Sequence, residues 1–160
     1  MNIYFAGSIR GGRDDQHLYA EMIDFLRTFG TVLTEHVGDA SLTDKGEADT
    51  GVKADQHGSH DRDSEAGSGL QGDRFIYNRD ADWIRASDLV IAEVTTPSLG
   101  VGYEIGFAES LGKRVIAVFR NSSGRRLSAM IAGNDRIEQI EYTSLEEVKE
   151  KLRHAISNSG

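Results

Sequence analysis

The sequence surroundings of two acidic residues, Asp80 and Glu104, suit carboxyl groups that act together on one bond of a substrate. Glu104 lies in PSLGVGYEIG at 97–106, where an apolar strand pattern passes into a helical one. The glycine spacing is close to that of dinucleotide-binding turns, yet a glutamate in the first helical turn would repel a pyrophosphate bound there. We therefore expect Glu104 to be the reactive group, kept ionised by the helix dipole. A glutamate that only stabilises its own helix is the alternative.

Asp80 is the expected partner of this glutamate. In the helical pattern at 74–86 it follows Ile76 by four residues and precedes Trp83 by three, which places it on the inward stripe. A carboxylate there is costly unless it is paired or functional, and burial would raise its pKa while Glu104 stays ionised. Two carboxyl groups in contrasting environments suit an acid and a nucleophile that act together. A buried aspartate that caps a loop amide is the alternative.

A third candidate is the glycine-rich turn GSIRGGR at 7–13, directly after the first strand pattern. Its glycines let backbone amides approach a ligand, and Ser8 and Arg10 add a hydroxyl and a guanidinium group that bind anions. The turn lacks the spacing and the lysine of a Walker A loop. We predict an anion site of another kind, the alternative being an ordinary tight turn.

The elements that must position these residues alternate along the chain. Helical periodicity is found at 18–29, 74–86, 102–111 and 144–156, and Gly30 and Gly112 are expected to end two of these helices. Strand patterns lie at 2–6, 31–34, 89–94, 115–119 and 136–142. This alternation predicts an α/β fold: a Rossmann-like or flavodoxin-like doubly wound parallel sheet with helices on both faces. Ligands of such sheets bind at the carboxyl ends of the strands.

The composition limits the class of protein. The chain has 160 residues, the length of one domain, and a formal net charge of −8. A surface for duplex nucleic acid needs a basic face, so this partner is not expected. The absence of cysteine excludes disulfides and thiolate chemistry. Neither a signal peptide nor a membrane span is expected, so the sequence predicts a cytoplasmic protein, or a nuclear one in a eukaryote.

One segment interrupts the alternation. Residues 44–69 form an acidic insertion without aromatic side chains, inside a polar stretch at 39–73. Such a segment cannot bury enough apolar area to offset its ordering entropy, which predicts a mobile loop. His57, His60, Asp61 and Asp63 could in principle bind a metal ion, but no apolar scaffold would hold them in place. We therefore favour a solvated loop and expect no metal site.

Several sequence blocks, in order along nearly the whole chain, resemble one family. They are YFAGSIRGGR, FGTVLTEH, RDADWIRASDLVIAEVTTPSLGVGYEIG and SGRRLSAMI. With these blocks the chain resembles the 2′-deoxynucleoside 5′-monophosphate N-glycosidases of the nucleoside 2-deoxyribosyltransferase superfamily. The resemblance implies one such domain over 1–160, a five-stranded parallel sheet, a homodimer, and a retaining reaction that needs neither metal nor cofactor.

The resemblance also implies roles for individual residues. Glu104 is expected to attack C1′ of the deoxyribose and form a covalent glycosyl intermediate, Asp80 to protonate or orient the departing base, and Tyr4 to lie beside this pair. Ser128 is expected to reach the phosphate site of the neighbouring subunit, and His36 to lie near the base. Further substrate contacts, several of them to the phosphate, are expected from Ser8, Ile9, Arg10, Gly11, Gly12, Ser98, Gly100, Gly102 and Met130.

The leading hypothesis is a hydrolase that splits 2′-deoxynucleoside 5′-monophosphates into a free base and 2-deoxyribose 5-phosphate. Its nearest alternative is a nucleoside 2-deoxyribosyltransferase, but the predicted phosphate site favours nucleotides, whereas transferases of this superfamily mostly take unphosphorylated nucleosides. A non-catalytic nucleotide-sensing module is the alternative from another class. The preferred base stays open.

Overall fold

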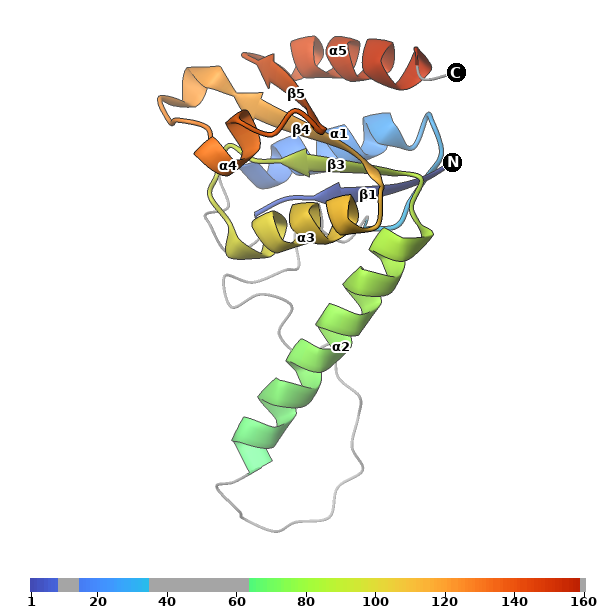
Figure 1. Ribbon diagram of the computed structural model, residues 1–160, viewed down its shortest axis with the longest axis vertical. Coiled ribbons are helices and arrows are strands. Elements are labelled where there is room, and N and C mark those ends of the chain that lie inside the picture. The colour runs from blue at the N-terminus through green and yellow to red at the C-terminus, as the bar shows by residue number, and fades with distance from the viewer. Residues whose placement is uncertain (9–14, 35–63, 159–160) are drawn as a thin grey trace.

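The computed structural model describes residues 1–8, 15–34 and 64–158. Its centre is a five-stranded sheet of β1 (Asn2–Ala6), β2 (Thr31–Val32), β3 (Leu89–Glu93), β4 (Arg114–Arg120) and β5 (Ile137–Tyr142). The spatial order is β2-β1-β3-β4-β5, and all neighbouring strands pair in parallel (Figure 1). This is the flavodoxin-like doubly wound order, so the predicted fold class is confirmed.

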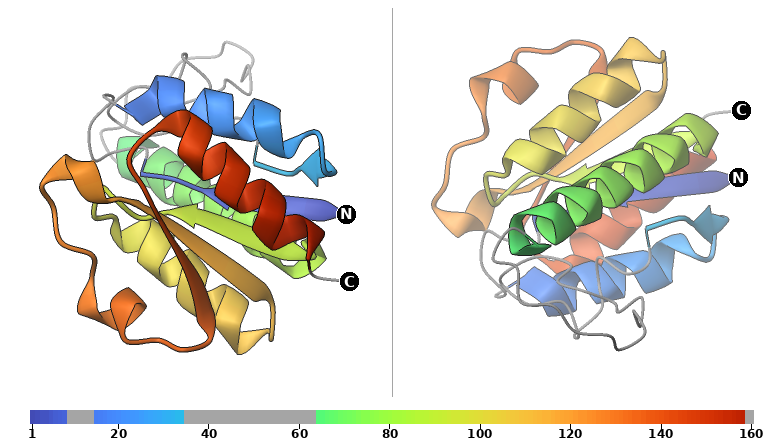
Figure 2. Two further views of the ribbon diagram at one scale, coloured as in Figure 1. Left: turned by 90° about the horizontal axis from the view of Figure 1, so that it is seen from above. Right: turned by 90° about the horizontal axis from the view of Figure 1, so that it is seen from below.

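Helices cover both faces of this sheet. They are α1 (Gln16–Leu26), α2 (Ser64–Ala86), α3 (Leu99–Ser110), the short α4 (Ala129–Ala132) and α5 (Leu145–Ser157), with a 3-10 turn, η3, at Asn121–Ser123. α1 and α5 lie on one face, and α2 and α3 lie on the other (Figure 2). The N-terminal half of α2 projects beyond the sheet (Figure 1). Cover on both faces explains why the central strands are apolar without alternation.

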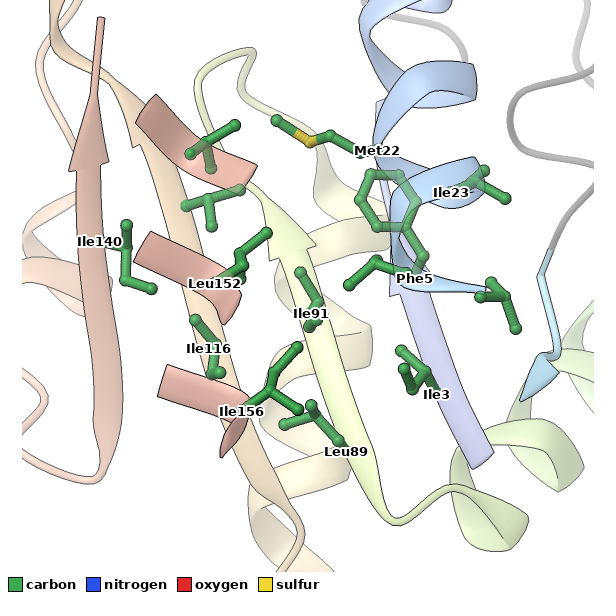
Figure 3. Close-up of a cluster of buried hydrophobic side chains, with 14 of the residues drawn as sticks. Ile3, Phe5, Met22, Ile23, Leu89, Ile91, Ile116, Ile140, Leu152 and Ile156 are labelled. Carbon is green, nitrogen blue, oxygen red and sulfur yellow. The ribbon is translucent and has the colours of Figure 1, made fainter. Parts of the chain in front are cut away.

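Each face of the sheet has its own apolar core, because successive side chains of a strand point to opposite faces. Ile3 and Phe5 of β1 face α1 and α5 in the larger core (Figure 3). Tyr4 and Ala6 of the same strand face α2 and α3 in the second core. β1 therefore directs the Tyr4 side chain towards the two helices that carry the predicted carboxyl groups.

α2 is longer than the sequence predicts. It begins at Ser64 rather than at 74, so the end of the predicted mobile insertion, 64–69, is helical and that part of the prediction was wrong. The C-terminal part of α2 is anchored by the buried Ala81 and Ile84. Each residue added to an existing helix gains a hydrogen bond, so a polar sequence can extend it. The rest of the insertion, up to residue 63, lies outside the described residues.

The two glycines expected to end helices behave differently. Gly112 has a positive φ of 69° and follows the C-cap Leu111 of α3, as predicted. α1, however, ends at Leu26, before Gly30. A Cβ at Gly30 would lie 2.0 Å from the Met1 carbonyl oxygen. Gly30 is therefore explained by the close approach of the N-terminal backbone, and its prediction as a helix stop was wrong.

Candidate active site

Three predicted residues meet on the α2–α3 side of the sheet. Tyr4 comes from β1, Asp80 from α2 and Glu104 from α3. The Tyr4 hydroxyl donates a 2.8 Å hydrogen bond to Glu104 Oε1, across 100 positions of sequence. Asp80 is near enough for its charge to act on both other groups. A phenol and two carboxyl groups from three separate elements thus form one site.

Both carboxyl groups line a cavity of about 160 Å³ between α2 and α3. Its walls are Tyr77, Asp80, Ala81, Ile84, Gly100, Tyr103, Glu104 and Phe107. A water molecule in the liquid occupies about 30 Å³, so the cavity has room for a group of the size of a sugar ring. Aromatic and aliphatic walls with two convergent carboxyl groups suit a ligand that is apolar on one side and polar on the other.

Glu104 is half-buried, and its environment disfavours its charge. Burial raises the pKa of Glu104 to about 7; the charge of Asp80 adds to the rise, and the hydrogen bond from Tyr4 opposes it. Burial also raises the pKa of Tyr4, so the phenol stays protonated and remains a donor to Glu104. The prediction that Glu104 is kept ionised was therefore wrong: near neutral pH both of its forms are populated.

The start of α3 also differs from the prediction that placed Glu104 at the helix dipole. The sequence predicts the helix from 102, which would place Glu104 in the first turn. α3 instead begins at Leu99, because Ser98 is its N-cap and accepts a 3.4 Å hydrogen bond from the Val101 amide. Glu104 therefore lies in the second turn, where the effect of the helix dipole is weaker.

Asp80 has a cationic partner that the sequence analysis missed. Nε and Nη2 of Arg79 lie 2.9 and 2.8 Å from Asp80 Oδ1. The same guanidinium carbon lies 4.7 Å from the centroid of the Trp83 ring and 5.9 Å from that of Phe75. The two carboxyl groups do have contrasting environments: a positive charge lies against Asp80, and burial raises the pKa of Glu104.

A further buried carboxyl group, Glu93, lies at the end of β3 on the α1–α5 side. It accepts hydrogen bonds from the hydroxyls of Tyr142 at 3.0 Å, of Tyr19 at 3.4 Å, and of Thr95. Burial raises the pKa of Glu93, against the effect of the hydrogen bonds from Thr95 and Tyr142. Three hydroxyl donors satisfy this carboxyl group, so we assign it a structural role.

An ion pair next to Glu93 connects the ends of three strands. Asp15, at the N-cap position of α1, pairs with Nη2 of Arg120 at 2.6 Å and accepts a 3.4 Å hydrogen bond from the Thr96 hydroxyl. Asp15 comes soon after β1, Thr96 follows β3, and Arg120 ends β4. The pair therefore ties the start of α1 to the end of β4 and to the residues after β3. No sequence signal indicates it, because its two members are 105 residues apart.

Four predicted substrate contacts lie in the described loops and at the start of α3. Ser8 is buried just after β1, and the side chain of Ser98 caps α3. Gly100 lines the cavity, and Gly102 is exposed. These positions are compatible with a ligand beside Glu104, but their contacts with a substrate stay predictions.

The remaining predicted contacts lie farther away or outside the described residues. Ser128 is the N-cap residue of α4, but its side chain makes no capping hydrogen bond, and Met130 is 82% exposed. Neither residue lines the cavity of the carboxyl pair. The other predicted contacts, which lie outside the described residues, are Ile9, Arg10, Gly11, Gly12 and His36.

Two kinds of site are not found in the described part of the chain. Residues 1–8, 15–34 and 64–158 contain no group of three His, Asp or Glu side chains arranged to hold a metal ion. Within the same ranges, no helix is both long and apolar enough to cross a lipid bilayer. His57, His60, Asp61 and Asp63 lie outside these ranges.

Comparison with known proteins identifies similar chains. The model of the nucleoside 2-deoxyribosyltransferase family matches residues 3–151. A Tetraodon nigroviridis protein named 5-hydroxymethyl-dUMP N-hydrolase is 49% identical over 161 residues, which cover 99% of each chain. The Mus musculus protein of that name is 47% identical over 154 residues, covering 94% of this chain and 77% of its own. A solved Clostridium botulinum CMP N-glycosidase shares the fold, with a TM-score of 0.57, 19% identity, and coverage of 97% of this chain and 99% of its own.

Proposed function

Because the chain belongs to the nucleoside 2-deoxyribosyltransferase family, we propose that it hydrolyses the N-glycosidic bond of 2′-deoxynucleoside 5′-monophosphates. The products are a free base and 2-deoxyribose 5-phosphate. The observation that carries this proposal is that Asp80 and Glu104 line one cavity while Tyr4 donates a hydrogen bond to Glu104. The two relatives named as N-hydrolases support hydrolysis over transfer to a second base.

The proposed reaction proceeds in two steps through a glycosyl enzyme. The ionised carboxylate of Glu104 forms a bond to C1′ while the bond from C1′ to the base nitrogen breaks. The electron pair of that bond leaves with the base, which takes up a proton, and Asp80 orients the base or donates this proton. Water then attacks C1′, gives up a proton and frees Glu104, so the configuration at C1′ is retained. Deoxyribose lacks the 2′ hydroxyl that would destabilise the cationic transition state inductively.

The phosphate and the base are assigned to different parts of the site. We place the phosphate beside Ser8, Arg10 and the N-terminus of α3, whose first amides favour an anion. Binding of a group remote from the reacting bond positions C1′ against Glu104. For the base we propose 5-hydroxymethyluracil, because the Tetraodon nigroviridis relative, which matches 99% of each chain, is named for this substrate.

The test is a substrate panel with purified protein. 5-Hydroxymethyl-dUMP, the four common deoxynucleoside monophosphates, their ribonucleotide counterparts and 5-hydroxymethyl-deoxyuridine are incubated separately, and released base is measured by chromatography. We expect base and 2-deoxyribose 5-phosphate from 5-hydroxymethyl-dUMP, and far less from the nucleoside that lacks the phosphate. Excess adenine is added in parallel. Accumulation of dAMP in place of the sugar phosphate would establish a transferase, and no product from any nucleotide would refute catalysis.

We further propose that the protein acts in the cytoplasm as a homodimer in which Ser128 reaches the phosphate site of the second subunit. Support comes from two exposed apolar side chains: Leu99, the first residue of α3, is 97% exposed, and Met130 in α4 is 82% exposed. A Cβ added at Gly102 or Gly106 on α3 would meet no atom within 4 Å, which leaves space for a close partner. Light scattering during size-exclusion chromatography should give twice the mass of one chain. The mass of a single chain would contradict the dimer.

The pH dependence of kcat/KM should report Glu104. Its pKa of about 7 in the free protein means that the protonated, unreactive form predominates at lower pH. We expect kcat/KM to fall about tenfold for each pH unit below 7, because the nucleophile must be ionised. The profile is measured by initial rates between pH 5 and 9, with circular dichroism to verify folding at each pH. A profile that is flat down to pH 5 would contradict Glu104 as the titrating group.

A further inference from the structure

Arg79 contacts Asp80 of the reactive pair, and its guanidinium group is also packed against aromatic rings. Its side chain is 19% exposed and that of Asp80 is 20% exposed, so the ion pair is largely removed from water. Both contacting nitrogens converge on the same oxygen, Oδ1, which anchors this end of the carboxylate. A largely buried pair of this kind is screened much less than a surface salt bridge.

Two aromatic rings hold the guanidinium in this position. Phe75 precedes Arg79 by four residues and Trp83 follows it by four, so all three side chains lie on one stripe of α2. The guanidinium carbon lies 4.7 Å from the centroid of Trp83 and 5.9 Å from that of Phe75, within the range of cation–π attraction. Asp80 lines the cavity beside Glu104, whereas Arg79 is not part of its lining. Arg79 thus acts on the cavity through Asp80.

We propose that Arg79 is a positioning residue that holds Asp80 in place as an ionised carboxylate beside Glu104. This inference rests on the proposed hydrolysis for its kinetic consequences, but the state of the two carboxyl groups can be measured without substrate. It also narrows the role of Asp80 in the resting protein: an ionised Asp80 orients the base and is ready to accept a proton from the attacking water.

The groups that face Asp80 and Glu104 indicate in which direction the loss of Arg79 would shift the pKa of these two carboxyl groups. Glu104 and Tyr103 face it from α3, Tyr4 from β1, and Tyr77 from α2 itself. Arg85, the next arginine of α2, lies over the ring of Phe107, 5.2 Å from its centroid, and pairs with Asp82. Arg79 is a cation in direct contact with Asp80. Its removal takes this positive charge from beside two adjacent carboxyl groups, which then hold a proton up to a higher pH.

The test compares Arg79→Met, Arg79→Lys and a matched control, Arg85→Met. Arg85 is also stacked on an aromatic ring and paired with an aspartate of α2, but it does not contact Asp80. For Arg79→Met we expect kcat to fall about tenfold or more with little change in KM, since a misplaced catalytic group costs rate rather than binding. The pH below which kcat/KM declines should rise by about one pH unit. Arg79→Lys should return the pH dependence to that of the wild-type protein but restore only part of kcat, and Arg85→Met should keep the wild-type pH dependence.

A carboxyl ¹³C NMR titration of the same proteins without substrate separates this inference from the proposed function. The Asp80 and Glu104 signals are assigned with Asp80→Asn and Glu104→Gln. We expect the titration midpoint of Asp80 and Glu104 to be higher in Arg79→Met and to return towards the wild-type value in Arg79→Lys. This result supports the inference even if no nucleotide is cleaved. An unchanged midpoint, or an unchanged pH profile in an active Arg79→Met protein, overturns it while hydrolysis stands. Should Arg79→Met not fold, Arg79→Lys and Arg79→Gln are compared by the same titration.

Discussion

Replacement of Glu104 by glutamine is expected to lower the rate of base release from 5-hydroxymethyl-dUMP at least about 1,000-fold, because an amide cannot form the bond to C1′. Glutamine has the shape of glutamate, and its side-chain oxygen can still accept the 2.8 Å hydrogen bond that the Tyr4 hydroxyl donates to Glu104. The loss therefore falls on the chemical step and not on the architecture of the site. Base release is followed by chromatography under single-turnover conditions.

The matched control for this variant is Glu109→Gln. Glu109 is on the same helix, but it interacts with Asn134 and Arg136 and not with the cavity. Full activity is expected for this control. Mass spectrometry of wild-type protein quenched during turnover should show the sugar phosphate on the peptide that contains Glu104. If Glu104→Gln keeps its activity, Glu104 is not the nucleophile. If both it and the wild-type protein bind nucleotide without cleaving it, the molecule is a nucleotide sensor.

The same substitution is expected to stabilise the fold above neutral pH. Burial raises the pKa of Glu104 from 4.5 to about 7. The unfolded chain loses this proton at lower pH than the folded one, so ionisation favours unfolding. The penalty is absent below pH 4.5, grows between 4.5 and 7, and is complete above 7. Glutamine avoids it, so Glu104→Gln should gain up to about 3 kcal/mol in the free energy of unfolding at pH 8, measured by urea titration.

Glu147→Gln supplies a control of opposite sign. Hydrogen bonds from Lys151 and Thr143 lower the pKa of Glu147 to about 2. A carboxyl group with a lowered pKa stabilises the fold above its unfolded value, so Glu147→Gln should lose stability at pH 8. If Glu104→Gln and the wild-type protein lose stability in parallel from pH 5 to pH 8, the raised pKa of Glu104 is contradicted.

Much of the fold was predictable because apolar strands leave a strong pattern. β1 has the predicted bounds, Asn2–Ala6, and the predicted doubly wound order follows from strands that alternate with helices. Element ends were less predictable, because they depend on tertiary contacts. β2 is limited to Thr31–Val32, and Gly30 is explained by the backbone of Met1. Neither contact has a signature in the neighbouring sequence.

The residues of the site were easier to predict than their charges. The helical position of Asp80 and the motif around Glu104 indicated two carboxyl groups, and the structure lines one cavity with both. Their protonation depends on neighbours that patterns do not reveal. Arg79 directly precedes Asp80, and adjacent residues of a helix do not normally face each other. The long arginine side chain nevertheless turns back onto Asp80 while it packs against Trp83.

The site also depends on the order in which the chain is made. β1 pairs with β2 on one side and with β3 on the other, and β3 begins only at Leu89. At ribosomal speeds of about 5–20 residues per second, the β3 edge of β1 stays unpaired for on the order of 10 seconds. The Tyr4–Glu104 hydrogen bond and the Asp15–Arg120 pair, spanning 100 and 105 positions, can form only after that. The pocket thus cannot assemble before α3 has been made, and until β3 emerges one edge of β1 is open to pairing with another chain.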